Sequence, residues 1–161
     1  MENVKDNNKG FSLIELIVVV AILAIISTAS ISAYGYLNLA NAEKCATKID
    51  IGLNKLKTLN MSEGSSTYMY LYRYNNAYYI AFNKNTTFSP DDSGEMIGNS
   101  GITVACEGKV LQNDDYIAIS VRKKDGAFTV PNVPTYTISV TNEATRKITL
   151  VTNTGKHYRD F

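Results

Sequence analysis

Several residue types are scarce in this 161-residue chain, and each scarcity excludes a class of site. The chain has one histidine, His157, and two cysteines, Cys45 and Cys106, which lie far apart and outside any C-x-x-C spacing. These side chains are too few for the usual zinc sites, so no metal is expected. The sequence also contains no G-x-S-x-G, P-loop, H-E-x-x-H or G-x-G-x-x-G pattern. We therefore predict neither an enzyme nor a bound cofactor.

An excess of charge of one sign is also missing. The formal net charge is +1, and no long run of Lys or Arg is present. Nucleic-acid partners are recognised through basic patches, so none is predicted here. The acidic segment at residues 91–95, "DDSGE", lacks the alternate-residue oxygen spacing of an EF-hand, and we interpret it as a solvated loop. His157, near the end of the chain, is expected to be a solvated tail residue.

The two cysteines leave two alternatives open. If the folded part of the chain is extracellular, a disulfide between Cys45 and Cys106 would close a loop of about sixty residues. On the chain-entropy model such a loop contributes about 4 kcal/mol to stability, less any strain. The other alternative is two separate buried thiols. The sequence cannot decide between them, because it does not show whether the two side chains meet.

Proline is absent before Pro90, so a single helix is expected over residues 11–60, about fifty residues or roughly 75 Å long. Leu16–Ile26 reads "LIVVVAILAII", without a polar side chain, and Leu13–Ala33 is long enough to cross a bilayer. We predict a membrane-spanning helix. The alternatives are a secretory signal cleaved near Ala33, a plain membrane anchor and, least favoured, a buried core helix.

One carboxylate, Glu15, interrupts this apolar run. A carboxylate in a membrane span costs about 2.5–3.5 kcal/mol near the bilayer centre and less near an end, and it usually has a partner. The chain offers no cation within helical reach on the C-terminal side. A cut between Gly10 and Phe11 would create an α-amino group about one turn away. That amine is the candidate partner of Glu15, in the same chain or in a neighbouring copy.

The segment "KGFSLIELIVVVAILAII" resembles the leader and N-terminal helix of type IV prepilins with a class III leader and a type IVa-like N-terminus. The resemblance implies that a membrane peptidase removes a polar leader after Gly10 and methylates the new N-terminal Phe11. It also implies that Glu15 pairs with the N-terminal amine of a neighbouring subunit during filament assembly. The match covers about twenty-five residues of the sequence.

The resemblance implies three regions: a cleaved leader at residues 1–10, an apolar membrane and assembly helix at 11–36, and a globular head at 37–161. The family's proline near Ser32 is missing, and no cysteine follows Cys106. The implied function is a type IV pilus subunit, first a single-pass protein of the cytoplasmic membrane and then part of a surface filament for adhesion, motility or aggregation. Its implied partners are other copies of the chain, prepilin peptidase and the pilus assembly machinery. The alternatives are a minor pilin, a pseudopilin of a secretion or DNA-uptake system, and a membrane-tethered binding module.

The rest of the chain predicts an α+β head, with an amphipathic helix at residues 37–60 packed on an antiparallel β-sheet, as in the pilin fold. Apolar residues recur at helical spacing at Ala42, Cys45/Ala46, Ile49, Leu53, Leu56 and Leu59/Asn60. Strands are predicted at 67–74, 77–82, 102–106, 115–123, 135–141 and 147–152, with a long surface loop at 83–101. The strands are close in sequence, which favours antiparallel pairing. The tyrosines at 68, 70, 72 and 74 are expected to pack across strands and against the helix, rather than to form a ligand-binding ladder.

Overall fold

The computed structural model describes residues 12–62, 66–142 and 144–160, and for residues 28–38 and 130 it describes the backbone alone. The chain separates into two compact units, Met1–Tyr36 and Leu37–Phe161, each of which is described by itself. Its α+β class agrees with the prediction, with one long α-helix followed by ten strands among the described residues.

Helix α1 spans Leu13–Ser62 as one continuous element of 50 residues, which confirms the predicted single helix. In the second unit its buried face follows the predicted spacing, since Ala42, Cys45, Ala46, Ile49, Leu53, Leu56 and Asn60 are all fully buried. Asn60 is the polar member of this face. Its amide donates to the carbonyl of Thr67 at 2.7 Å and accepts from the Thr67 N–H at 2.5 Å. These two bonds tie the end of α1 to the start of the first strand.

The first sheet has the strand order β3-β2-β1-β6-β7. Its members in chain order are β1 (Tyr68–Tyr74), β2 (Ala77–Asn83), β3 (Glu95–Gly98), β6 (Tyr116–Val121) and β7 (Phe128–Val130). The predicted hairpin between β1 and β2 is confirmed, and its two turn residues, Asn75 and Asn76, have φ values of 48° and 60°. Two successive positive φ values are the geometry of a type I′ turn, in which asparagine is favoured.

The second sheet has the strand order β10-β9-β8-β4-β5. Its members are β4 (Thr103–Cys106), β5 (Lys109–Val110), β8 (Thr135–Thr141), β9 (Thr145–Val151) and β10 (Lys156–Asp160), with a 3-10 turn at Thr152–Thr154 before β10. All strand pairs in both sheets are antiparallel, as predicted. The prediction of one sheet is wrong, because β8 pairs with β4 and β9 instead of joining β6.

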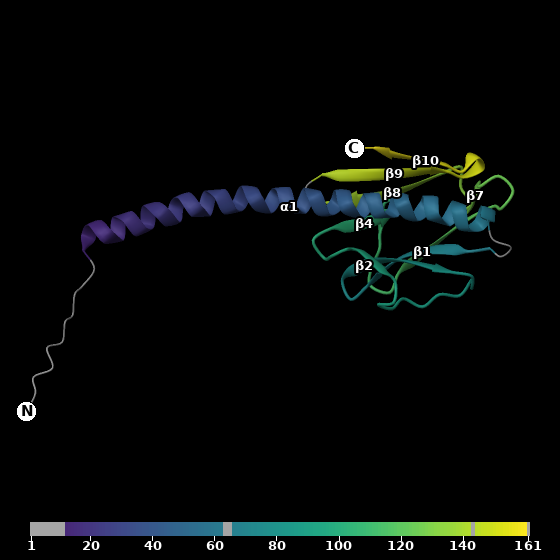
Figure 1. Ribbon diagram of the computed structural model, residues 1–161, viewed down its shortest axis with the longest axis horizontal. Helices are drawn as coiled ribbons and strands as arrows, with labels where there is room; N and C mark the ends of the chain where they lie inside the picture. The colour runs from purple at the N-terminus through teal and green to yellow at the C-terminus, as the bar shows by residue number, and fades with distance from the viewer. Residues whose placement is uncertain (1–11, 63–65, 143, 161) are drawn as a thin grey trace, which may run out of the picture. The chain divides into compact units, whose positions relative to one another are not determined.

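The hydrophobic core lies between the C-terminal half of α1 and both sheets, and Figure 1 shows this half of the helix running alongside strands of each. Ile49, Leu53 and Leu56 of α1 share one cluster with residues of both sheets: Met69, Leu71, Tyr78, Ile80, Ile119, Val121 and Phe128 from the first, and Val104, Cys106, Ile138, Val140, Ile148 and Leu150 from the second. A single apolar stripe on the helix therefore holds the two sheets together.

Strands β3 and β10 differ from the prediction. β3 lies inside the segment predicted as a loop, and β10 lies in the predicted solvated tail. Both are edge strands of their sheets. In β3 only Ile97 is buried, and β10 reads "KHYRD", so neither carries the apolar alternation by which a strand is recognised in sequence. Edge strands are often short and charged, because this protects a sheet from pairing with other chains.

Two tyrosines of the β1 stripe, Tyr70 and Tyr72, are fully buried, but not against the helix. Tyr70 and Tyr72 alternate with Met69 and Leu71, which face the core shared with α1, so the two rings lie on the other side of the sheet. There Phe88 stacks on Tyr70, with ring centroids 4.3 Å apart, and meets Tyr72 edge-on at 4.9 Å. The expected packing across strands is correct, whereas the expected packing against the helix is wrong.

Candidate functional site: the start of the N-terminal helix

Ser12 and Glu15 form a reciprocal pair at the start of α1. The Glu15 N–H donates to the Ser12 hydroxyl, and the Ser12 N–H and hydroxyl both approach Oε2 of Glu15, each at 3.3 Å. This is a capping box, in which a serine before the helix and a glutamate three residues later satisfy each other's backbone donors. A carboxylate in the first turn is also favoured by the helix dipole. Glu15 therefore has a local structural role that the sequence reasoning missed, although S-x-x-E is a recognised signal.

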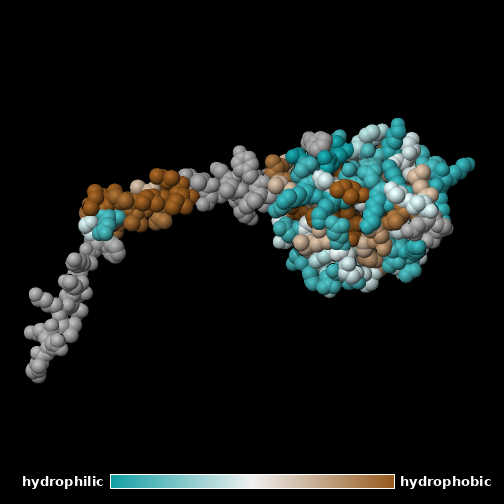
Figure 2. All heavy atoms as spheres, viewed as in Figure 1, coloured by the Kyte–Doolittle hydropathy of each residue, from teal (hydrophilic) through white to brown (hydrophobic). Residues whose placement is uncertain are grey.

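The segment that follows the capping box exposes an unbroken apolar surface. From Leu13 to Ile26 the large apolar side chains are between 49% and 79% exposed. Figure 2 shows this part of the helix as hydrophobic, in contrast to the mainly hydrophilic surface of the second unit. Apolar patches of this extent on a soluble monomer are rare and mark surfaces that bind other apolar groups.

The predicted cleavage site, methylation site and membrane span lie wholly or partly outside the described residues. Gly10 and Phe11, the predicted cleavage and methylation sites, lie outside the described residues. The predicted membrane span extended to Ala33, and the side chains of residues 28–33 lie outside them as well. Among the residues that were searched, no helix combines the length and apolarity needed to cross a membrane, so the predicted span is not confirmed.

The cysteines Cys45 and Cys106 are free and buried. Of the two alternatives left open by the sequence, the structure has separate thiols. Cys45 lies on the core face of α1, and Cys106 ends β4 beside Tyr136, whose hydrogen bond acts to lower the thiol's pKa. Burial dominates at both positions and raises the pKa of each thiol to about 12. A thiol that stays protonated is a poor nucleophile, so neither cysteine is a candidate reactive site.

His157 is not a solvated tail residue, and that prediction is wrong. Its side chain is only 8% exposed, because β10 lies beside α1. The imidazole Nε2 is 3.0 Å from Oδ1 of Asp50, and Nδ1 is 3.1 Å from Nζ of Lys57. Further along the same two elements, Arg159 contacts the hydroxyl of Thr47 at 2.7 Å. Together these contacts form a polar seam between α1 and the last strand.

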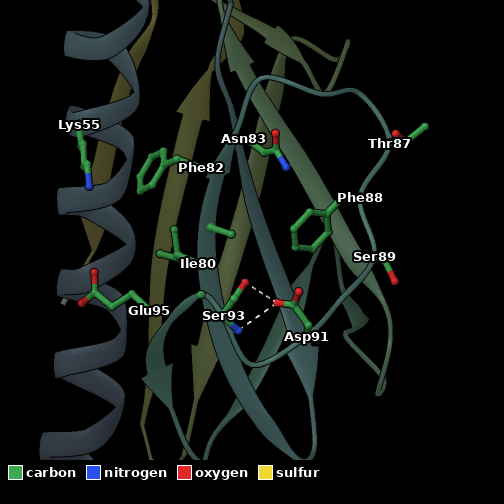
Figure 3. A pocket seen from close by; sticks show the side chains of 12 residues that line it. Lys55, Ile80, Phe82, Asn83, Thr87, Phe88, Ser89, Asp91, Ser93 and Glu95 are labelled. Carbon is green, nitrogen blue, oxygen red and sulfur yellow. Dashed lines mark hydrogen bonds between the residues drawn. The ribbon is translucent and has the colours of Figure 1, made fainter.

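A hollow of about 440 Å³ lies between α1, β2 and the loop that follows β2 (Figure 3). The rings of Phe82 and Phe88 line it, and Lys55 reaches over the Phe82 ring at 4.6 Å. Its two carboxylates already have partners. Asp91 accepts hydrogen bonds from the backbone N–H and hydroxyl of Ser93, and Glu95 pairs with Lys48 at 3.0 Å. The described residues contain no cluster of three or more metal-binding side chains, in this hollow or elsewhere.

Comparison with known proteins identifies the N-terminal segment. Residues 5–31 match the family model described as the prokaryotic N-terminal methylation motif, which is the class III leader signal of type IV pilins. The match includes the predicted cleavage site, the Ser12–Glu15 pair and all of the exposed apolar segment from Leu13 to Ile26. No curated protein and no solved structure matches the chain. The chain therefore carries the leader and helix start of a pilin-type protein.

Proposed function

We propose that this protein is the structural subunit of a type IV pilus. The observation that carries the proposal is the continuity of three features: the methylation motif at residues 5–31, the Glu15 carboxylate in the first helical turn, and the exposed apolar surface behind it. The motif supports a type IV pilin-like protein or a pseudopilin, a class of structural proteins that are not enzymes. The finer role as a filament subunit is our inference.

In this proposal the chain is anchored at the cytoplasmic membrane through its apolar segment before assembly, and prepilin peptidase cuts after Gly10 and methylates Phe11. The mature chains then associate through their N-terminal helices, and the side chains between Leu13 and Ile26 are buried against neighbouring copies. Leaving such a surface in water would cost about 25 cal/mol for each Å² of apolar area, so we expect it to be covered by lipid before assembly and by neighbouring copies afterwards. The heads at residues 37–161 would then be displayed on the filament surface.

Glu15 gives the association its register. A buried carboxylate without a partner carries a penalty of several kcal/mol, and pairing with the N-terminal amine of a neighbour offsets much of it only at the correct axial offset. The capping box holds the carboxylate in the first turn of the helix. The same group thus orders the helix start before assembly and selects the stagger during assembly.

Fractionation of cells tests the proposal against its three alternatives. A filament subunit is expected to be the dominant protein in material sheared from the cell surface. A pseudopilin or minor pilin would be at most a trace component of the sheared fibres. A membrane-tethered binding module would remain in the membrane fraction after shearing, and either of these outcomes would contradict the proposed role.

A further inference from the structure

His157 holds the last strand of the fold to the long helix through a defined pattern of donors and acceptors. The ammonium of Lys57 can only donate, so Nδ1 of His157 must be the acceptor of their 3.1 Å contact. The proton of a neutral imidazole then resides on Nε2, which donates to Asp50 at 3.0 Å. The neutral ring therefore bridges a cation and an anion two turns apart on α1, and each of its nitrogens is satisfied.

The surroundings of the ring favour this neutral state. α1 presents Asp50 and Lys57, β7 presents the uncharged ring of Phe128 edge-on at 6.3 Å, and the β9 residue opposite His157 in register is Leu150. Three further charged groups lie along the polar seam. Glu43 of α1 is 2.8 Å from Arg146 of β9 and 3.6 Å from Arg159 of β10. The carboxylate of Glu43 is thus already paired with two cations of β9 and β10.

Protonation breaks the pattern. An imidazolium has two N–H donors and no acceptor, so it cannot receive the Lys57 hydrogen bond. Two cations would then share a contact of 3.1 Å, and Asp50 is the one carboxylate that contacts the ring among the described residues. Strand β10 is the edge of its sheet and is bonded to β9 alone among the described strands. Its hold on α1 through His157 is therefore the contact that acid would weaken first.

We propose that His157 is an acid-sensitive latch that holds β10 against α1 when neutral and loosens this strand when protonated. Burial and the Lys57 charge lower the pKa of His157 below its ordinary value of about 6.5, while Asp50 acts in the opposite direction. Because the fold favours the neutral ring, the latch's contribution to stability is fully present above about pH 6.5. It is lost as the pH falls from there toward the lowered pKa.

The test follows the imidazole itself, in the full chain held in detergent. Since His157 is the only histidine, its ring protons give a single NMR titration without assignment. We expect a midpoint below about 6.5. Lys57→Met should raise the midpoint, because a cation is removed, and Asp50→Asn should lower it, because an anion is removed. A midpoint at or above 6.5 in the unmodified chain, or no shift in either variant, would overturn the proposal.

Hydrogen exchange, corrected for the intrinsic effect of pH, measures the release of the strand. Between pH 7.5 and pH 5 the amides of Lys156–Asp160 that bond to β9 should lose protection, by at most about 30-fold, because pH 5 lies about 1.5 pH units below the ordinary histidine pKa of about 6.5. The amides of the β1–β2 hairpin serve as the internal control and should not change. In His157→Gln the amide can donate to Asp50 and accept from Lys57 but does not titrate, so β10 should keep equal protection at both pH values. An equal loss of β10 protection in this variant would overturn the latch.

Discussion

Glu15→Gln is expected to lower the yield of filaments about 100-fold or more. Removing one partner of a buried ion pair costs about 3–5 kcal/mol, and each 1.4 kcal/mol corresponds to a factor of ten. The variant would leave the N-terminal ammonium of a neighbouring subunit unpaired in apolar surroundings. The measurement is the amount of this chain in sheared surface fibres, relative to its total amount in the cell.

The capping box supplies the matched control for this experiment. Glutamine can replace glutamate at the third helical position of a capping box, so Glu15→Gln removes the charge and keeps the cap. Ser12→Ala does the reverse, since it removes the hydroxyl that accepts the Glu15 N–H and keeps the carboxylate. The alanine variant should destabilise the helix start by about 0.5–2 kcal/mol and lower filament yield much less than the glutamine variant. Wild-type filaments from Glu15→Gln, or equal losses in both variants, would contradict a pairing role for the charge.

Gly155→Ala is expected to lower the free energy of unfolding by about 2–5 kcal/mol, the sum of a left-handed backbone penalty and overpacking. Gly155 lies between the 3-10 turn and β10, with φ at 65°. A Cβ added there would lie 2.1 Å from the carbonyl oxygen of Gly126 and 2.7 Å from its carbon. These are backbone atoms, so the clash cannot be relieved by the rotation of a side chain. The effect is measured as the urea midpoint of the full chain in detergent.

Gly108→Ala separates the two parts of this penalty. Gly108 also has a positive φ, 77°, but a Cβ added there would have no heavy atom within 4 Å. This variant should therefore cost only the backbone term, about 1–2 kcal/mol. Equal shifts in the two variants would mean that the close approach of Gly155 to Gly126 does not hold in solution.

The sequence predicts the helix and its buried face correctly because both depend on local spacing. The absence of proline over residues 11–60 and the recurrence of Ala42, Ile49, Leu53 and Leu56 are read directly from the chain. The β1–β2 hairpin is equally local, since two asparagines between alternating apolar runs favour a tight turn. The N-terminal methylation motif was recognised for the same reason, because the leader, the cleavage site and Glu15 lie within one short segment.

The features that were missed depend on long-range pairing. His157 meets Lys57 across 100 residues, and Arg159 meets Thr47 across 112, so no pattern near the C-terminus indicates these contacts. The division of the strands into two sheets is decided by which strand pairs with β8, and alternation within a strand does not specify its neighbour. Phe88 packs on both Tyr70 and Tyr72, and it lies in a segment whose composition is typical of a loop.

The capping box was also not predicted, although its sequence signal is local. Ser12 and Glu15 stand three residues apart directly before an apolar run, which is the spacing of a helix start. A carboxylate inside an apolar run suggests a distant or newly created partner, whereas its nearest partner in the structure is Ser12. The two roles are compatible, because Oε2 holds the Ser12 N–H at 3.3 Å and a carboxylate has further acceptor positions for an amine.

The intact mass of the chain recovered from sheared surface filaments tests the central claim most directly. The account predicts a chain that begins at Phe11 and is one methyl group heavier than the unmodified residues from Phe11 onward. This single value reports both the cut after Gly10 and the methylation of the new N-terminus. A chain that retains Met1, or one that begins near Ala33, would contradict processing at Gly10 and with it the proposed pairing of Glu15.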